Sequence, residues 1–530
     1  MSSPAPKSPE QSEKSKKYDR QLRLWGDHGQ RFLENSKVCL INATALGTEI
    51  LKSLVLPGIG SFTIIDGEKV TEEDIGSNFF LDNDSLGNSR AQAATMCLLE
   101  LNPDVRGDYI DEFPENVMKQ NQDFLKGFSV VIATALPEKF LIPLSKQLWD
   151  AGIPLFSCKS IGLLGYARLQ VNEHTVIEVH PDNDNPDLRL DEPWPALKEH
   201  LESFDISKLD KKERSHVPAL IILYYFMQKF RNLHDGALPT NRAEKDQLRN
   251  MIRACGNEEG LLEENFEEAI HYVNTCLSHS KISSQVQSIL DDPKCLNLNQ
   301  DSAPFWVMVS ALRELVQTEG SLPVKGSLPD MAADTNSYIT LQQIYQKRFN
   351  EQVETVQRRV SEILRNVNQS PDAITEDEIK LFCKHANELY IVRGTCIADE
   401  YQSSTLDISM YLDDPDSLMM YYVILRGLDR FLSEFNAYPG QFDDQVEPDV
   451  VKLKSTIGKL LAEWGCGQVL RDERVHEVCR YGGAEMHSIS AILGGCVAHE
   501  VIKLITHQYK PLNNTFIFDA ITSNSVTYRL

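Results

Sequence analysis

The segment that follows the first apolar run of the chain has the spacing of a nucleotide-binding loop. Residues 36–42 (SKVCLIN) lead into Asn42-Ala43-Thr44-Ala45-Leu46-Gly47, and Asp66 ends the next apolar run. In a dinucleotide-type frame, loop glycines permit the turn, let amides approach a phosphate and let helix pack on strand, while the acid binds a ribose hydroxyl. Here Asn42 can make the turn, Gly47 keeps the packing role and Asp66 suits the ribose. Thr44 places a β-branched side chain at the phosphate position.

These residues predict a nucleotide-binding frame that has lost phosphate binding. An α/β fold that never bound a nucleotide explains the same loop, and the loop residues alone do not separate the two interpretations.

Alternating strands and helices must position this loop. Buried strands are predicted at 36–42, 61–65, 129–133 and 153–157, because each is a short apolar run with β-branched residues. Helices are predicted at 46–56, 90–101 and 140–149, and Pro57-Gly58 and Asn102-Pro103 end the first two. This alternation predicts an α/β fold with a parallel sheet and helices on both faces.

Beyond about Arg168 the signals are mostly helical, and the clearest helices are predicted at 218–231, 266–279, 305–319 and 338–367. Residues 318–329 are rich in Gly, Pro and Ser and predict a linker. A helix at 489–506 and paired strands at 515–519 and 525–528 are predicted near the C-terminus. A chain of 530 residues exceeds one ordinary domain, so we expect two or three units.

The composition argues against two classes of partner. The net charge is −24, and so acidic a surface repels nucleic acid and anionic lipid, although many proteins are acidic simply for solubility. The most apolar predicted helix, 218–227, is far shorter than the roughly 20 residues that span a bilayer.

Eleven cysteines, none in a C-x-x-C pair, favour free thiols in a reducing compartment. Residues 1–17 predict a disordered tail, and we expect a soluble cytoplasmic protein, with the nucleus left open.

Several collinear motifs resemble one family. KYDRQLRLWGDHGQ (17–30), LKSLVLPGIGSFTIIDGEKV (51–70) and SLGNSRAQAA (85–94) are similar to the activating enzymes of ubiquitin-like proteins, which include bacterial sulfur-carrier adenylyltransferases of the ThiF/MoeB type. SIGLLGYARL (160–169), LPDMAADTNSYITLQQIY (328–345) and AILGGCVAHEVIKLIT (491–506) resemble the eukaryotic members. These motifs cover about two fifths of the chain. The length and the overall match favour the neddylation branch, since sumoylation counterparts are shorter and single-chain ubiquitin-activating enzymes about twice as long.

The resemblance implies a Rossmann-like adenylation fold interrupted by a large, mostly helical insertion. It assigns residues 18–168 to the first part of a pseudo-adenylation domain and 169–325 to an insertion like a catalytic-cysteine half-domain. Residues 326–472 would continue the insertion and include the partner-contact region, and 473–530 would complete the adenylation-type domain.

The resemblance also implies that the adenylating chemistry has been lost from this chain. Active members bind ATP and magnesium, form an acyl-adenylate of the modifier and pass it to a cysteine as a thioester. Against their pattern, the arginine that follows the ribose acid is Ser77, the metal-associated aspartate is Leu136, and a lysine is replaced by Arg90. A leucine cannot ligate magnesium. A surface cation at a helix start explains Arg90 equally well.

Arg20, in contrast, is retained from the family pattern. In family dimers the matching arginine reaches the partner's ATP phosphates, so the resemblance implies an arginine finger in trans. Pairing with a surface carboxylate is the competing interpretation of Arg20.

The resemblance further implies a partner and an interface. ATP, magnesium and the thioester cysteine would belong to a catalytic partner subunit in a heterodimer, and this chain would bind no cofactor. Residues 330–343 match the stretch where the two halves pack, and the predicted contacts are Asp330, Met331, Tyr338, Leu341, Gln342 and Gln343. An ordinary amphipathic core helix is the competing interpretation of that stretch.

No cysteine has the Pro-x-Cys-Thr setting of a thioester nucleophile. Cys39, Cys158, Cys383, Cys396 and Cys496 are therefore predicted to be packing residues. The pair Gly494-Gly495 permits close backbone approach, and Glu500 and Lys503 are predicted to form a local helix pair.

Three other functions remain open. A self-sufficient activating enzyme would catalyse ATP–pyrophosphate exchange alone, which Leu136 argues against. A nicotinamide-dependent dehydrogenase would bind a dinucleotide tightly, which Thr44 opposes. An adaptor that inherited the fold would join no activating complex.

Overall fold

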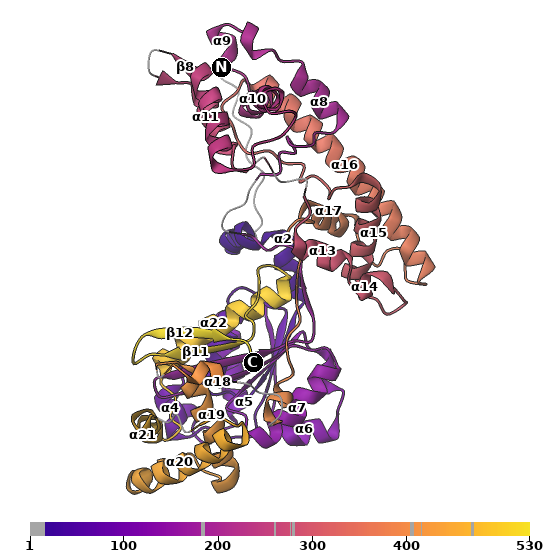
Figure 1. Ribbon diagram of the computed structural model, residues 1–530. Coiled ribbons are helices and arrows are strands. Elements are labelled where there is room, and N and C mark those ends of the chain that lie inside the picture. Colours follow the sequence, from indigo (N-terminus) through magenta and orange to yellow (C-terminus); the bar gives the residue numbers. More distant parts are fainter. Residues whose placement is uncertain are drawn as a thin grey trace, which may run out of the picture. The chain divides into compact units, whose positions relative to one another are not determined.

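The computed structural model describes residues 16–181, 186–258, 261–275, 277, 281–402, 408–414, 416–467 and 471–530 (Figure 1). Residues 1–15 of the predicted disordered tail (1–17) therefore lie outside the described residues. The chain divides into two compact units. The first comprises Met1–His174 and Ile391–Leu530, and the second comprises Thr175–Tyr390.

The first unit is built on an eight-stranded sheet with the order β12-β11-β6-β5-β4-β1-β2-β3. Five neighbouring strands pair in parallel, because β1 joins β2 and β4, β2 joins β3, and β4 joins β5. β6, β11 and β12 extend the sheet in antiparallel fashion. The strands are β1 (Lys37–Ile41), β2 (Ser61–Ile65), β3 (Arg106–Ile110), β4 (Val130–Thr134), β5 (Leu155–Ile161), β6 (Leu164–Gln170), β11 (Thr515–Asp519) and β12 (Asn524–Tyr528). The predicted mostly parallel α/β sheet is confirmed.

Helices cover both faces of this sheet. Neighbouring helices α2 (Asp19–Asn35), α22 (His487–Thr506), α3 (Ala45–Val55) and α5 (Arg90–Leu101) form one layer. The other face packs on α6 (Pro114–Gln120) and α7 (Glu138–Asp150), with an apolar core that includes Ile41, Val131, Leu144 and Leu155. α22 is long and apolar enough to cross a membrane by composition. It packs against α3 and α2, so its apolar face belongs to the core.

Close packing of α22 on α3 depends on one glycine of the predicted pair. A Cβ at Gly494 would lie 2.9 Å from the Cβ of Glu49, whereas a Cβ at Gly495 would meet nothing within 4 Å. The predicted close approach is confirmed at Gly494 only. The predicted pair of Glu500 and Lys503 is confirmed at 2.6 Å.

The chain returns to the first unit earlier than the sequence suggested. The boundary predicted at residue 473 lies at Ile391, because residues 418–479 share one apolar core with Ile161, Tyr166 and Ile517 of the sheet. The helices of this return segment are α18 (Ser409–Leu412), α19 (Met419–Phe435), α20 (Val446–Glu463) and α21 (Asp472–Tyr481).

The second unit is mostly helical. Its longest helix, α16 (Thr335–Asn366), contributes Leu341 and Tyr345 to a core with α10 (Ala219–Leu233). Its other helices are α8 (Pro195–Glu202), α9 (Lys211–Arg214), α11 (Arg242–Gly256), α12 (Glu264–Tyr272), α13 (Ser284–Leu290), α14 (Pro293–Leu296), α15 (Pro304–Glu319) and α17 (Glu376–Lys384).

The predicted linker at 318–329 is not a domain linker. Its first two residues end α15, and the rest lacks regular structure, as expected. Leu322 and Val324 are nevertheless buried, and the Val324 amide donates to Gln352 Oε1 at 3.0 Å. The segment is therefore part of the second unit's core, and the boundary predicted at 325 falls inside that unit. The helix predicted at 266–279 ends at Tyr272, and residues 276 and 278–280 lie outside the described part.

Candidate functional site: a closed nucleotide loop

The predicted loop lies at the switch point of the sheet, where β1 is flanked by β2 and β4. The carboxyl ends of these parallel strands meet at one edge, which is where open α/β sheets bind ligands. Asn42 adopts a left-handed conformation, with φ of 68°, and makes the predicted turn. Its Nδ2 donates to the Thr134 carbonyl at 2.8 Å, and the Thr134 hydroxyl donates to the Asn42 carbonyl at 2.7 Å. The first turn of the loop is thus tied to the end of β4.

Thr44 caps the helix that a phosphate would face. Its Oγ1 accepts from the Gly47 amide at 3.3 Å and lies 3.1 Å from Thr134 Oγ1. A threonine cap satisfies one of the free amides at the start of a helix. Gly47 keeps its predicted packing role, since a Cβ there would lie 2.8 Å from the Asn42 carbonyl oxygen.

Asp66 is fully occupied by groups of the chain itself. It is buried, and Arg90 Nε donates to its Oδ2 at 2.7 Å. The same Oδ2 accepts from the Ala43 amide at 2.8 Å, and Oδ1 accepts from the Glu68 amide at 2.9 Å. Arg90 also donates to Asp74 at 3.0 Å. A buried carboxylate with this many donors has little capacity left for a ribose hydroxyl.

Arg90 lies at the predicted degenerate site, bonded to Asp66, and not at the surface. Its side chain is only 13% exposed, so it is not a surface cation. The charges of Asp66 and Asp74 raise the pKa of the guanidinium against the opposing effect of burial. With both carboxylates paired to it, Arg90 acts as a structural bridge between β2 and α5.

A residue that the sequence interpretation missed lies at the loop. The Leu46 amide, in the first turn of α3, donates to Glu485 Oε2 at 3.4 Å. Burial raises the pKa of Glu485 to about 7, while the Ala45 and Leu46 amides, the Thr44 hydroxyl and the charge of Arg90 favour the charged form. Glu485 is 439 positions from Leu46 along the chain, so no local pattern could have pointed to it.

Two other predicted positions also lack the chemistry of an active site. Leu136 is buried in the apolar core around Ile41 and Leu141. The Ser77 hydroxyl donates to the Glu73 carbonyl at 3.0 Å, a bond within the short helix α4 (Glu72–Ser77). The neighbouring Asn78 points inward instead, where its Nδ2 donates to the Ala43 carbonyl at 3.2 Å. The Asn78 side chain therefore supports the loop by a hydrogen bond to its main chain.

Arg20 differs from all of these groups because it is exposed. Tyr18 and Gln21, on either side of Arg20, fix the start of its helix. Tyr18 is buried, with its hydroxyl donating to Asp104 at 3.2 Å, and Gln21 Nε2 donates to the Pro57 carbonyl at 2.8 Å. Arg23, one turn on, pairs with Asp19 at 3.0 Å. Within the described ranges no carboxylate pairs with Arg20, so the competing interpretation of a surface ion pair is not supported.

Sequence comparison with known proteins matches almost the whole chain to one family. The ThiF family model matches residues 18–530. The chain is 48% identical over 526 residues to the NEDD8-activating enzyme E1 regulatory subunit of Danio rerio, covering 98% of this chain and 99% of that protein. The chain belongs to the ThiF family. A regulatory subunit of the same name from Drosophila melanogaster is 46% identical over the full length of both chains, and one from Saccharomyces cerevisiae is 27% identical over 97% of this chain and all of that protein.

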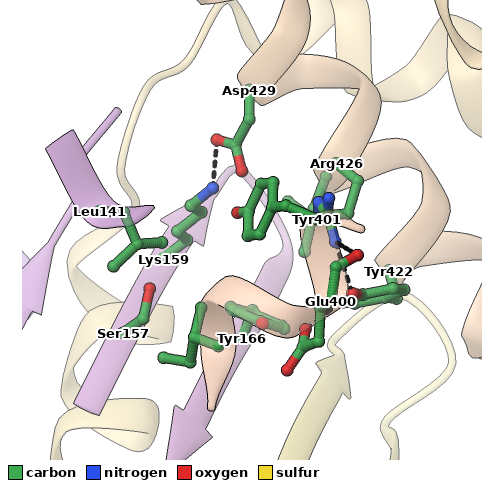
Figure 2. Close-up of a pocket in the computed structure, with 11 residues that line it drawn as sticks. Leu141, Ser157, Lys159, Tyr166, Glu400, Tyr401, Tyr422, Arg426 and Asp429 are labelled. Atoms are coloured by element: carbon green, nitrogen blue, oxygen red, sulfur yellow. Dashed lines mark hydrogen bonds and ion pairs between the residues drawn. The ribbon is translucent and has the colours of Figure 1, made fainter. Parts of the chain in front are cut away.

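Figure 2 shows a small cavity in the first unit. This cavity of about 10 Å³ lies between β5, β6, α7 and α19. Lys159 pairs with Asp429, and Arg426 Nη1 donates to the Tyr422 hydroxyl at 2.8 Å. Arg426 also lies over the Tyr401 ring, 3.5 Å from its centroid. The cavity is therefore a polar joint between sheet and return segment, too small for a substrate.

The cysteines of this ThiF-family chain are mostly packing residues, as predicted. Cys39, Cys158, Cys383 and Cys396 are buried, and burial raises the pKa of the Cys383 thiol to about 12. The prediction was wrong for Cys496, which is exposed because it lies on the outer side of α22. Among the described residues no cluster of three or more His, Cys, Asp or Glu side chains could hold a metal ion.

The predicted interface residues lie at the start of α16 in the second unit. Leu341 is fully buried beside Tyr345, so it is a core residue and the prediction of a partner contact there was wrong. The sequence could not separate the buried face from the exposed face of this helix because both carry apolar residues. The other predicted contacts are accessible: Asp330, Gln342 and Gln343 are exposed, and Met331 and Tyr338 are half-buried.

Proposed function

We propose that this chain is the non-catalytic subunit of a heterodimeric activating enzyme for a NEDD8-like modifier, and that Arg20 completes the ATP site of the catalytic partner. The observation that carries the proposal is a contrast within the first unit. The groups that would hold a nucleotide are bonded to one another, whereas Arg20 is exposed on an anchored helix without a carboxylate among the described residues.

Exposed apolar side chains on the helix layer that includes α2 support this proposal. Leu24 lies one helical turn from Arg20 on α2 and is 51% exposed. The same layer of helices exposes Met96 at 59% and Ile492 at 51%, and Phe79 is 78% exposed next to His487. Exposed apolar side chains grouped on adjacent elements are typical of protein interfaces.

The proposal assigns ATP and magnesium to the partner subunit and no cofactor to this chain. Leu136 and the bonded Asp66 support that assignment, since neither offers a ligand to a metal or a nucleotide. The modifier would reach this chain only within the complex. The buried thiols and the acidic surface suit the cytoplasm as the working compartment.

The test is Arg20→Ala in the reconstituted heterodimer, with ATP–pyrophosphate exchange as the measurement. Removing an arginine finger costs on the order of 10³-fold in rate, so exchange is expected to fall by about that factor. Arg23→Ala is the matched control, because Arg23 lies on the same helix but pairs with Asp19. Unchanged exchange with Arg20→Ala would defeat the trans-arginine proposal. Exchange by the isolated chain would defeat the non-catalytic assignment.

A further inference from the structure

The first turn of α3 already holds a carboxyl side chain of the same chain. Free amides at a helix start, together with the positive end of the helix dipole, form a general anion site. In this chain Glu485 Oε2 accepts the Leu46 amide at 3.4 Å, and the charge of Arg90 acts on the same carboxylate. A loop amide, a threonine hydroxyl and an arginine are also the donors that a nucleotide phosphate would use.

Glu485 is held in place by its own backbone. The Gly162 amide donates to the Ala484 carbonyl at 2.8 Å, and Gly162 forms a parallel bridge with Glu485. Gly162 has φ of 55°, and a Cβ there would lie 2.2 Å from the Tyr481 ring. Gly482 and Gly483, at the end of α21, also take positive φ. These glycines build a tight connection between the β5–β6 turn and the segment before α22, so the carboxylate is delivered to the loop by fixed main chain.

We infer that the carboxyl group of Glu485 occupies the phosphate position of the loop, and that this group, rather than the bulk of Thr44, keeps nucleotide phosphates out. The inference rests on the proposed function, in which this loop is a nucleotide-binding frame that has lost phosphate binding, and it names the group that blocks the phosphate position. Thr44 itself faces the helix as a cap, with its Oγ1 bonded to the Gly47 amide, and leaves the Leu46 amide to Glu485.

The test uses the full-length chain alone and inorganic pyrophosphate as the probe. Glu485→Ala removes the carboxylate and keeps the loop, so pyrophosphate in excess over its Kd is expected to raise the Tm by about 2 °C or more, relative to sodium chloride of equal ionic strength. The wild-type chain and Thr44→Gly are expected to show no such rise, because both keep Glu485. Glu477→Ala is the matched control, since Glu477 lies on α21 and pairs with Arg480.

Each outcome decides the inference. A rise with Glu485→Ala alone supports it, whereas no rise with that variant, or an equal rise with Thr44→Gly, overturns it. If Glu485→Ala folds poorly, the yield of soluble chain on refolding decides: a higher yield with pyrophosphate supports the inference, and an unchanged yield overturns it. The pyrophosphate test uses the isolated chain, whereas the Arg20 exchange assay uses the heterodimer. A negative result in one therefore does not change the interpretation of the other.

Discussion

Arg90 and Arg20 belong to the same unit but have opposite surroundings. Arg90 is bonded to Asp66 and Asp74 at the edge of the sheet, and its side chain is 13% exposed. Arg20 lies on α2 in solvent, while its neighbours Tyr18 and Gln21 anchor the helix. A guanidinium that is saturated within the chain contributes to stability, and one that is left unpaired on a rigid element remains available to a partner. The comparison distinguishes Arg90, which is bonded within the chain, from Arg20, which we propose to act on a partner, although both residues are arginines.

The largest effect is expected from breaking the closed loop. Asp66→Ala leaves Arg90 without its main partner in a mostly buried position, which costs about 3–5 kcal/mol in unfolding free energy. The shift of the urea midpoint measures this loss. Asp111→Ala is the control, because Asp111 pairs with Lys69 at the surface and is expected to cost less than about 1 kcal/mol. Equal losses from both variants would contradict the structural role of the buried pair.

The packing of α22 against α3 supports the same closed loop, and two adjacent glycines test it. Gly494→Ala places a Cβ 2.9 Å from Glu49 Cβ and 3.1 Å from the Glu49 carbonyl carbon. Such overpacking costs about 1–3 kcal/mol. Gly495→Ala meets nothing within 4 Å and should stabilise the helix by about 0.5–1 kcal/mol. Thermal unfolding of the two variants should therefore shift in opposite directions, and a shift of the same sign in both would refute the packing argument.

The pH dependence of stability should reveal Glu485. Burial raises its pKa from 4.5 to about 7, with Arg90 opposing the shift and Tyr438 facing the carboxylate. A raised folded-state pKa means that its contribution to stability is complete below about 4.5 and is lost as the pH rises through about 7. Relative to Glu485→Gln, the wild-type chain should lose about 3 kcal/mol of unfolding free energy between pH 4.5 and 7. Urea midpoints of both chains at several pH values measure this loss, and a wild-type chain that gains stability relative to Glu485→Gln as the pH rises would contradict the prediction.

The smallest effect is expected at Arg20. Arg20→Ala in the isolated chain should change the unfolding free energy by no more than about 0.5 kcal/mol, because the side chain is exposed. Arg23→Ala, which breaks the pair with Asp19, should cost about 0.3–0.5 kcal/mol. A large loss of stability from Arg20→Ala would place Arg20 with Arg90 as a structural group, and a reduced exchange rate could then no longer be assigned to a missing finger.

The central strands were predictable because their signals are local. β1, β2, β4 and β5 are apolar runs that lie inside the sheet, so their sequences alone indicate them. β3 was missed since it is an edge strand of sequence RGDYI with mostly exposed or half-buried side chains. β6 was missed as a strand although all of it is buried, because it carries a charged residue, Arg168, which pairs with Glu400 from the return segment.

The sequence predicted the backbone conformation of the loop but not the pairing of its charged groups. The left-handed turn at Asn42 and the packing at Gly47 follow from residue type. The bonds of Asp66 to Arg90 and of Leu46 to Glu485 join positions 24 and 439 residues apart, and such pairing depends on the completed fold. The same reason explains Leu341, whose burial depends on which face of α16 packs against α10.

The antiparallel extension of the sheet has a consequence for how the chain is made. β6 pairs with β11, a strand near the end of the chain, and β11 pairs with β12, which ends at Tyr528. Until β11 and β12 have been synthesised, β6 has an open hydrogen-bonding edge, and such edges promote aggregation. Truncation before Thr515 is therefore expected to leave β6 as an unpaired edge strand and to lower the yield of soluble chain.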